Sequence, residues 1–510
     1  MEEKCTKAPI FTLETVFKDS AEIPIDIEFN MPDYCPEISR ILKCKAAVRI
    51  SAAGAEGRKI SVDGTATVTV TYADSENLVN SYEYQYPFSK SFDTGVDVSD
   101  SFIKSRAKCE YVNCRAVSGR KLDIHGAAGV YVTALMKKSR DIICDIESEG
   151  IEVLRSTAPT VMPTGYAEKY LIIEDEIEVG PSQPDVRCLI SYDATAHADE
   201  CKLLAGKAVV RGELAVSILY RGDDGELQPL ESKIPFSQLV EAEGVSEDCE
   251  CKVAAYVAYL EIKPKFNASQ VSRGFSLDGK IRLSLEAYCL SEVAFITDAY
   301  SRKYEAEISG DEVTFDRLVC NVKDTFNFKK ELDFPIDSVS RICDMKCEPK
   351  PESCTFEDDC FMLSGSVNCS MLAVDESGAP AYYEKQTDFE YRYKLPESGE
   401  DLNAQPEISV ISCGYTITGG NRVEVRAEMA VTAAVYESKR VSLVSDVTVN
   451  ESRLIGKSGR GALTVYFAES GESVWDVARK YLADIDEVRQ INGLGDDELI
   501  SGQMILVPMK

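Results

Sequence analysis

The sequence has little of what catalysis by histidine or metal binding by paired ligands would need. Among 510 residues there are two histidines, His125 and His197, and no Cys-x-x-Cys pair despite 18 cysteines. Zinc sites use closely spaced Cys and His ligands, so this spacing argues against a metal centre. The G-x-S-x-G, P-loop and H-E-x-x-H motifs are also missing. We therefore predict no catalytic residues, no metal ligands and no cofactor.

Positive charge and long apolar runs are also scarce. The chain has 56 Lys and Arg against 86 Asp and Glu, a net charge of −30, and no basic cluster. Nucleic acid and anionic membrane surfaces are therefore expected to be poor partners. No run has the length of a transmembrane helix, and residues 1–4 do not begin a signal peptide. We expect a protein that is made and kept in the cytoplasm.

The cysteines are accordingly expected to be free thiols in a reducing compartment, several of them as small core residues. The densest group has five members: Cys343, Cys347, Cys354, Cys360 and Cys369. We interpret these as scattered thiols. Later oxidative cross-linking and an adventitious metal site stay open as alternatives.

Two acidic runs and one glycine-flanked pair are candidates for functional sites. Glu174–Glu176 and Glu357–Asp359 are interpreted as solvated strand edges and turns rather than an acid/base couple. Gly222–Gly225 lacks the spacing of a calcium loop and predicts a hairpin turn. Catalysis by a Cys/His pair would require His125 or His197 to approach a thiol in the fold.

The last fifty residues have the pattern of a small β-α-α-β module. A strand near Val465–Ala468 precedes Ser473 and Asp476, which have the spacing of a helix cap. A second helix is expected from Asp484 to Asn492, and a closing strand over Met504–Val507. The motifs G-E-S-V-W, I-N-G-L and G-Q-M-I-L-V-P closely resemble a LysM domain, which we place at residues 462–510.

The LysM resemblance implies binding of N-acetylglucosamine polymers between two loops, where exposed backbone groups hold a sugar amide. By motif, the predicted ligand- or partner-binding residues are Gly471, Glu472, Ser473, Val474, Asp496, Asp497, Glu498, Leu499 and Ile500. The second loop is strongly acidic, so a protein partner with basic residues is the alternative. Trp475 stands where LysM modules bury a side chain and is interpreted as core.

The first 460 residues contain one unit three times. Strands opened by Gly64, Gly212 and Gly365 are separated by 148 and 153 residues, and a phenylalanine follows each glycine 24 residues later. A later short strand recurs at 122–126, 275–279 and 423–427. The repeat predicts domains at 1–148, 149–302 and 303–455, then a linker at 456–461.

Within each unit, β-branched residues alternate with polar ones, as in residues 65–72, and hairpin-like turns follow. This is typical of antiparallel sheets with one buried face. The predicted fold class is mainly β: three tandem β-sandwich or barrel-like repeat domains plus the LysM domain.

The repeat motifs resemble a known family. They are Ser39–Ile41 and Ser340–Ile342, strand ends at Tyr72 and Tyr220, and Pro-Phe pairs at 87–88 and 235–236. Together with a terminal LysM domain they are similar to the SipL-like proteins of spore-forming clostridia, whose repeated unit is the SPOCS domain. The third unit departs from this pattern, with Ala373 and Asp388 in place of Tyr and Pro.

The resemblance implies a non-enzymatic spore coat morphogenesis protein. It would be made in the mother cell cytoplasm and act at the forespore surface, binding a SpoIVA-like ATPase of the coat's basal layer. The alternative is a peptidoglycan- or N-acetylglucosamine-binding cell-wall protein that acts through its LysM domain. A wall hydrolase would require a secretion signal and a catalytic motif, and the sequence shows neither.

Overall fold

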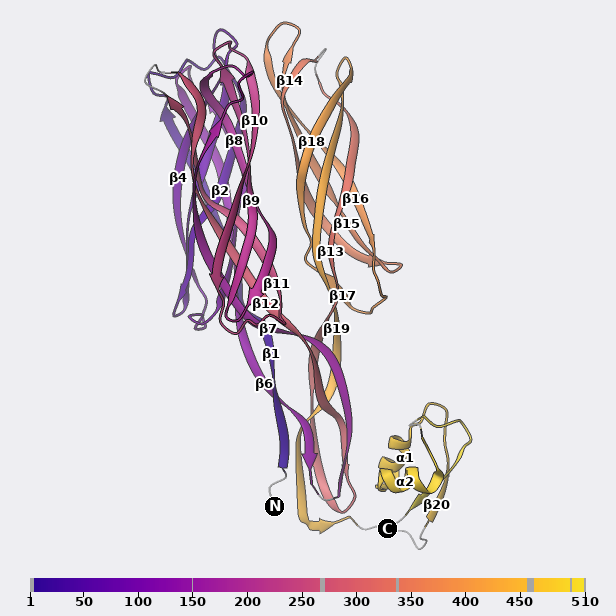
Figure 1. The fold of residues 1–510 in the computed structure, drawn as a ribbon. Coiled ribbons are helices and arrows are strands. Elements are labelled where there is room, and N and C mark those ends of the chain that lie inside the picture. Colours follow the sequence, from indigo (N-terminus) through magenta and orange to yellow (C-terminus); the bar gives the residue numbers. More distant parts are fainter. Residues whose placement is uncertain are drawn as a thin grey trace.

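The computed structural model shows an elongated molecule in which a head of β-strands narrows to a stalk, with two short helices beside the stalk's far end (Figure 1). It describes residues 4–148, 150–266, 271–335, 339–455, 463–495 and 498–508. The predicted linker at 456–461 lies outside the described residues. The mainly β fold class is confirmed, since 78% of the residues are in strands and the described helices are two short ones.

The first unit consists of two antiparallel sheets. One has the order β1–β6–β5, with β1 (Lys4–Asn30), β5 (Phe102–Ala116) and β6 (Lys121–Glu147). The other has the order β2–β3–β4, with β2 (Arg40–Glu56), β3 (Lys59–Ala73) and β4 (Val79–Asp93). The core lies between them, because alternate residues of β3 pack against alternate residues of β1 and β6.

The second and third units repeat this strand order. The second contains β7 (Ile151–Glu178), β8 (Val186–Leu204), β9 (Lys207–Gly222), β10 (Leu227–Glu241), β11 (Glu250–Phe266) and β12 (Ser272–Ser301). The third contains β13 (Tyr304–Asp333), β14 (Val339–Glu357), β15 (Cys360–Asp375), β16 (Pro380–Lys394), β17 (Leu402–Ala404), β18 (Glu407–Gly419) and β19 (Arg422–Leu454). The strand that is continuous as β5 and β11 is thus divided in the third unit into β17 and β18.

The glycines that mark the sequence repeat occupy the same position in all three units. A phenylalanine ring lies over each one: Phe88 over Gly64, Phe236 over Gly212 and Phe389 over Gly365. A Cβ at Gly64 would lie 2.4 Å from the Phe88 ring, so only glycine leaves room for the ring. The recurring Gly and Phe therefore reflect core packing.

The tyrosines at the ends of two of these strands are also structural. Tyr72 and Tyr220 are fully buried, and their hydroxyls donate to the carbonyls of Pro36 (3.2 Å) and Pro184 (3.3 Å). Each bond holds the loop that precedes β2 or β8 against the core. Ala373 occupies the equivalent place in the third unit and has no hydroxyl to make this bond.

The stalk is formed jointly by the three units. The outer ends of β1 with β6, β7 with β12 and β13 with β19 form three two-stranded ribbons (Figure 1). Their apolar side chains meet in shared clusters, one of which consists of Ile143, Ile146, Ile296, Ala299, Val444 and Val447. Ile143, Ile296 and Val444 each lie 17 residues beyond the equivalent Gly126, Gly279 and Ala427. The units therefore surround an approximate threefold axis.

The head closes around the same axis. The Ser81 hydroxyl of the first unit donates to the Leu189 carbonyl of the second (3.1 Å), and Glu226 of the second forms an ion pair with Arg341 of the third. Arg40 of the first unit completes the ring by donating to the Pro380 carbonyl of the third. Each unit thus contacts both of the others.

Charged residues at equivalent positions face one another in this ring. Lys45, Asp193 and Lys346 are separated by the same 148 and 153 residues as the marker glycines. Asp193 accepts from Lys45 at 2.9 Å and also pairs with Lys346. Burial would raise the pKa of Asp193, but the two ammonium groups outweigh it and hold this pKa below its usual range. The pairing joins all three units.

The LysM module has the predicted order: β20 (Leu463–Phe467), α1 (Val474–Tyr481), α2 (Ile485–Asn492) and β21 (Met504–Pro508). The Ser473 side chain caps the Asp476 N–H of α1, and Asp476 bonds back to the Ser473 N–H. Asp484 caps α2, which ends at Gly493 with a positive φ of 63°. Both predicted helix starts are confirmed.

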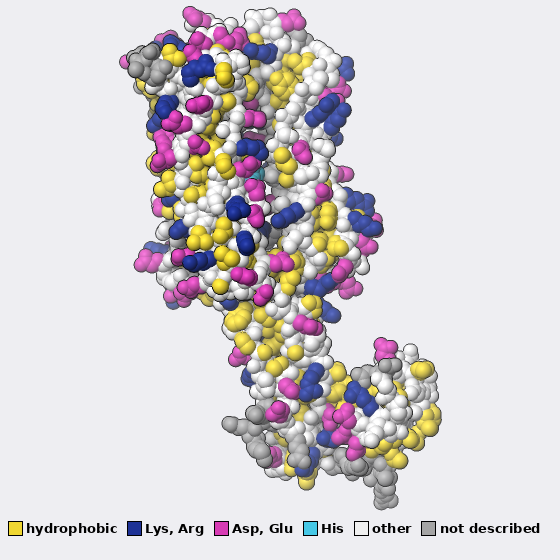
Figure 2. All heavy atoms as spheres, in the orientation of Figure 1, with side chains coloured by type: hydrophobic (Ala, Val, Ile, Leu, Met, Phe, Trp, Pro, Cys, Tyr) yellow, Lys and Arg dark blue, Asp and Glu magenta, His cyan; other side chains and the backbone are white. Residues whose placement is uncertain are grey.

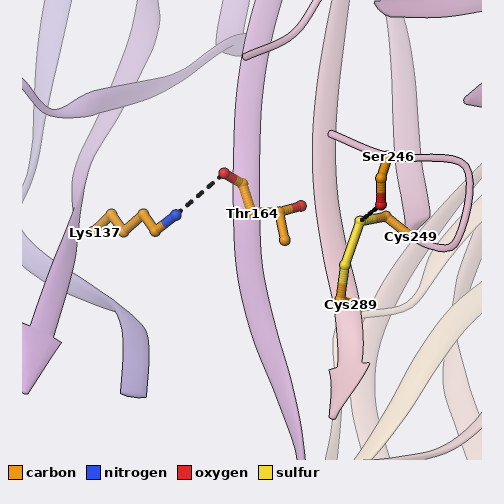
Figure 3. Close-up of a disulfide and its surroundings, with 5 residues drawn as sticks. All are labelled: Lys137, Thr164, Ser246, Cys249 and Cys289. Carbon is orange, nitrogen blue, oxygen red and sulfur yellow. Dashed lines mark hydrogen bonds between the residues drawn. A yellow bond between two sulfur atoms is a disulfide. The ribbon is translucent and has the colours of Figure 1, made fainter. Parts of the chain in front are cut away.

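One pair of cysteines is bonded, so the prediction of free thiols throughout is wrong for Cys249 and Cys289 (Figure 3). Glu250 pairs with Tyr288 across β11 and β12, which places the two cysteines opposite each other with their Cα atoms 4.5 Å apart. That separation is within the range of disulfides. The strand register that brings them together could not be read from a separation of 40 residues.

Candidate functional site

The LysM module is docked against the stalk of the second unit. Trp475 on α1 packs against Tyr300 on β12 with ring centroids 5.0 Å apart, and both side chains are buried. The Trp475 indole N–H donates to the Asp298 carboxylate at 2.9 Å, and Arg479 pairs with the same carboxylate at 2.8 Å. The interpretation of Trp475 as a buried side chain is correct, but part of its surroundings comes from outside the module.

A second group of contacts fixes the turn between the two helices. The Tyr300 hydroxyl donates to the Ala483 carbonyl at 2.7 Å, and Arg302 pairs with both Asp484 and Glu152. Burial raises the pKa of Tyr300 and of Glu152. Because Asp484 also caps α2, the docking contact and the helix start depend on one carboxylate. The module is therefore held in a defined position.

The two loops predicted to form the groove lie side by side. Ser473 and Glu498 form an isolated antiparallel bridge, and the Leu499 N–H donates to the Glu472 carbonyl at 3.2 Å. The Glu472 carboxylate accepts from the Tyr466 hydroxyl and from the Glu469 N–H. Several polar groups that a sugar amide would use are therefore already bonded within the protein.

The predicted groove residues differ in exposure. Val474 and Leu499 are buried in the module's core, whereas Gly471, Glu498 and Ile500 are exposed. Asp496 and Asp497 lie outside the described residues. The structure thus brings together the two loops, while the binding role of their residues stays a prediction.

A surface that the sequence reasoning missed lies on the outer face of the LysM sheet. Leu463, Val465 and Phe467 alternate along β20, and Met504 pairs with Phe467 across the sheet. All four side chains are at least half exposed, as is Ile500. Figure 1 shows the helices toward the stalk and β20 away from it, and hydrophobic side chains gather along this outer margin in Figure 2. The sequence signal for this surface was the pattern of β20 and β21, in which apolar residues occupy both faces of the strand pair, so that one apolar face is left exposed.

Two further hollows lie between the units. A groove of about 1290 Å³ separates β11 of the second unit from β18 of the third, and Lys252 and Glu407 face each other across it at 3.6 Å. A smaller cavity of about 370 Å³ lies where head and stalk meet, with walls from all three units. Lys137 of the first unit donates to the Thr164 carbonyl of the second in this region (Figure 3).

The two histidines and the acidic run at 357–359 lie in separate local environments. His125 lies between the carboxylates of Asp26 (2.9 Å) and Asp123 (3.0 Å), and the hydrogen bond to Asp26 raises its pKa. His197 lines the groove between the second and third units. Within the described residues, no hydrogen bond joins its ring to a thiol. Asp358 and Asp359 form the tight turn between β14 and β15, as predicted.

The dense cysteine group is divided between different parts of the core. In the described residues no group of three or more His, Cys, Asp or Glu side chains could hold a metal ion. Cys343 packs in an apolar cluster shared by the units, away from Cys347, which instead faces Cys369 at 3.8 Å and Cys413 at 3.3 Å. The interpretation as scattered thiols therefore holds except around Cys347.

Comparison with protein families identifies both kinds of domain. The SipL, SPOCS domain family matches residues 37–117 and 185–265, which span β2–β5 and β8–β11. The LysM domain family matches residues 468–508. The corresponding strands β14–β18 of the third unit lie outside these matches, although they have the same arrangement.

Comparisons with curated proteins and with solved structures gave no match. No described helix is both long and apolar enough to cross a membrane. SPOCS and LysM domains are non-catalytic binding domains, and their combination fits a sporulation-related, cell-wall or peptidoglycan-binding protein. With two segments that match the SPOCS domain of SipL, a third unit of the same strand order and a terminal LysM domain, the chain has the domain organisation of a SipL-like protein.

Proposed function

We propose that the protein is a non-enzymatic scaffold of the spore envelope, which binds a SpoIVA-like ATPase of the coat's basal layer at the forespore surface in the mother cell. One observation carries the proposal: the LysM module is docked by buried contacts at the far end of the stalk, with its apolar outer face directed away from it. A tether needs such an arrangement, because the binding surface is held at a fixed distance from the head.

The partner surface combines apolar contact with negative charge. Exposed Val465, Phe467 and Met504 offer the apolar centre, and Glu498 lies at the border of the neighbouring acidic loop. The chain as a whole, at a net charge of −30, repels anionic wall polymers and favours a partner with basic residues. Apolar contact at the centre and charge at the rim is the usual composition of protein interfaces.

The test measures binding of the full-length chain to the ATPase with the variants Phe467→Ser and Met504→Ser combined. Both residues are exposed, so folding should be unaffected, while loss of about 1–2 kcal/mol of apolar contact at each would weaken binding at least tenfold. Ile172→Ser removes an equally exposed apolar side chain from β7 and is the matched control. Unchanged binding by the double variant would refute this surface.

The second candidate is the peptidoglycan-binding protein, which the LysM match favours. Binding measured after replacing Asp496, Asp497 and Glu498 with Asn and Gln distinguishes the scaffold from the peptidoglycan-binding protein. A contact with a basic protein should weaken with this change and with added salt, since screening shortens the range of charge attraction to about 10 Å at ~0.1 M. Binding of N-acetylglucosamine oligomers that is insensitive to both the substitutions and the salt would favour the peptidoglycan-binding candidate.

Gene deletion provides the cellular test. Coats detached from the forespore would support the scaffold, and normal coats with an altered cortex or wall would support the second candidate. Complementation with the combined Phe467→Ser and Met504→Ser variant should fail to restore attachment, whereas Ile172→Ser should restore it.

A further inference from the structure

Each unit has a seam between two strands that contact each other without a hydrogen-bonded ladder. The seam lies between β2 and β5 in the first unit, β8 and β11 in the second, and β14 and β18 in the third; over the described residues these strands are in contact but unpaired. Side chains cross it instead. The Tyr192 hydroxyl donates to the Leu260 carbonyl (3.3 Å), and Tyr415 donates to the Ile342 carbonyl (2.9 Å).

Two cysteines face each other across the seam of every unit. Cys347 on β14 and Cys413 on β18 have their sulfur atoms 3.3 Å apart. In the first unit Cys44 on β2 and Cys114 on β5 pack against the same core cluster, and each thiol shifts the pKa of the other. In the second, Cys201 on β8 and Cys251 on β11 also share one cluster and shift each other's pKa.

The pairs do not occupy equivalent positions in the repeat. Cys44 lies 148 residues before Tyr192, so the thiol of the first unit stands where the second has the tyrosine that crosses the seam. Copying of one ancestral pair therefore does not account for all three. Each unit therefore has a pair of thiols across its seam, but the position of the pair along the seam differs from unit to unit.

We propose that the three seams are disulfide-forming sites, Cys44–Cys114, Cys201–Cys251 and Cys347–Cys413, which covalently close each unit when the protein meets an oxidised low-molecular-weight thiol. A thiolate of each pair attacks the small-molecule disulfide and releases one thiol. The second cysteine then attacks the resulting mixed disulfide and releases the other. The protein loses two electrons and two protons, and the small molecule gains both as two thiols.

The environments of the sulfurs suit this sequence of attacks. Interaction with the Cys44 thiol lowers the pKa of Cys114, and interaction with the Cys201 thiol lowers the pKa of Cys251. The same interactions raise the pKa of Cys44 and of Cys201. One thiol of the pair therefore becomes a thiolate more readily than its neighbour, which is the asymmetry that thiol–disulfide exchange uses.

Access distinguishes these pairs from other neighbouring thiols. Cys44, Cys114, Cys201, Cys251 and Cys413 are all partly exposed, and Cys201 and Cys251 line the groove between the second and third units. Cys369, the other neighbour of Cys347, is fully buried on β15. A small disulfide can therefore reach Cys413, while Cys369 is shielded, so Cys347–Cys413 is the bond expected in the third unit.

The test treats the full-length protein with oxidised glutathione, blocks the remaining thiols and maps cross-linked peptides by mass spectrometry. We expect the three seam pairs, and a melting temperature about 10 °C above that of the untreated protein, since each bond closes a loop of about 50–70 residues. Reduction should reverse the shift. Glutathione adducts without cross-links, unmodified thiols in any of the three seams, or pairing with other cysteines would each overturn the proposal.

Two variants separate the seam bonds from the existing Cys249–Cys289 disulfide, which both retain. The combined variant Cys114→Ser, Cys251→Ser and Cys413→Ser should fold in the reduced state and lose the rise in melting temperature. The matched control, Cys144→Ser with Cys320→Ser, removes partly exposed cysteines of β6 and β13, which are not seam strands, and should retain it. An equal rise in both variants would refute the assignment.

Discussion

Release of the LysM module by one substitution in the stalk is the sharpest consequence of the docking contact. Tyr300→Ala removes the ring that packs on Trp475 and the hydroxyl that donates to Ala483, while leaving every LysM residue in place. We estimate about 1–2 kcal/mol for ring burial, about 1 for the aromatic pair and about 1 for the hydrogen bond. A total of about 3–4 kcal/mol would shift the ratio of docked to released module several hundred-fold.

Trp475 is the sole tryptophan in the chain, so its fluorescence reports on this contact directly. We expect a red-shifted emission and stronger acrylamide quenching in Tyr300→Ala, because the indole loses its cover and moves away from Asp298. Tyr300→Phe retains the ring and should show a much smaller change. Tyr259→Ala, which removes an exposed tyrosine from the head, is the control. A buried, unshifted emission in Tyr300→Ala would contradict the docking reasoning.

Two further predictions concern the packing of the units. Gly64→Ala should lower the free energy of unfolding by about 2 kcal/mol, because its Cβ would meet Phe88 and the Arg49 carbonyl, whereas Gly54→Ala, with open space around its Cβ, should have little effect in the same thermal melts. Asp193→Asn should cost about 1–2 kcal/mol at neutral pH, a value reduced for the one-third exposure of the carboxylate, because Lys45 and Lys346 lose their shared partner. Since the pKa of Asp193 is depressed in the folded state, its contribution is complete above the unfolded value of about 3.9 and is lost as the pH falls below it. The difference between wild type and Asp193→Asn in denaturant unfolding should therefore narrow below about pH 4, and a constant difference from pH 7 to pH 3 would show that the ion pairs are not its origin.

Local signals accounted for the LysM module and for the strands of each unit. The caps at Ser473 and Asp484 are set by neighbours within three residues, so the sequence alone predicts them. The Gly64–Phe88 contact was visible as a repeated spacing, although the closeness of the ring to the glycine was not. The loops of the groove were placed by motif, and the structure brings them together at Ser473 and Glu498.

The arrangement around a common axis was not predicted. Strands such as β19 continue for 33 residues, and their outer halves pack against other units. Alternation along a strand shows that one face is buried, but it does not show which chain segment covers that face. The same reasoning explains why the Cys249–Cys289 bond and the contact between Trp475 and Tyr300 were missed, since both depend on partners that are distant in sequence.

The Lys45–Asp193–Lys346 contact has a consequence for stoichiometry. In a ring of three identical subunits, one position would supply three lysines or three aspartates around the axis, and like charges would repel. Joining three diverged units in one chain allows opposite charges to occupy symmetry-related places. Within the described residues it also places one LysM module beside three head units, where a homotrimer of the same shape would carry three modules.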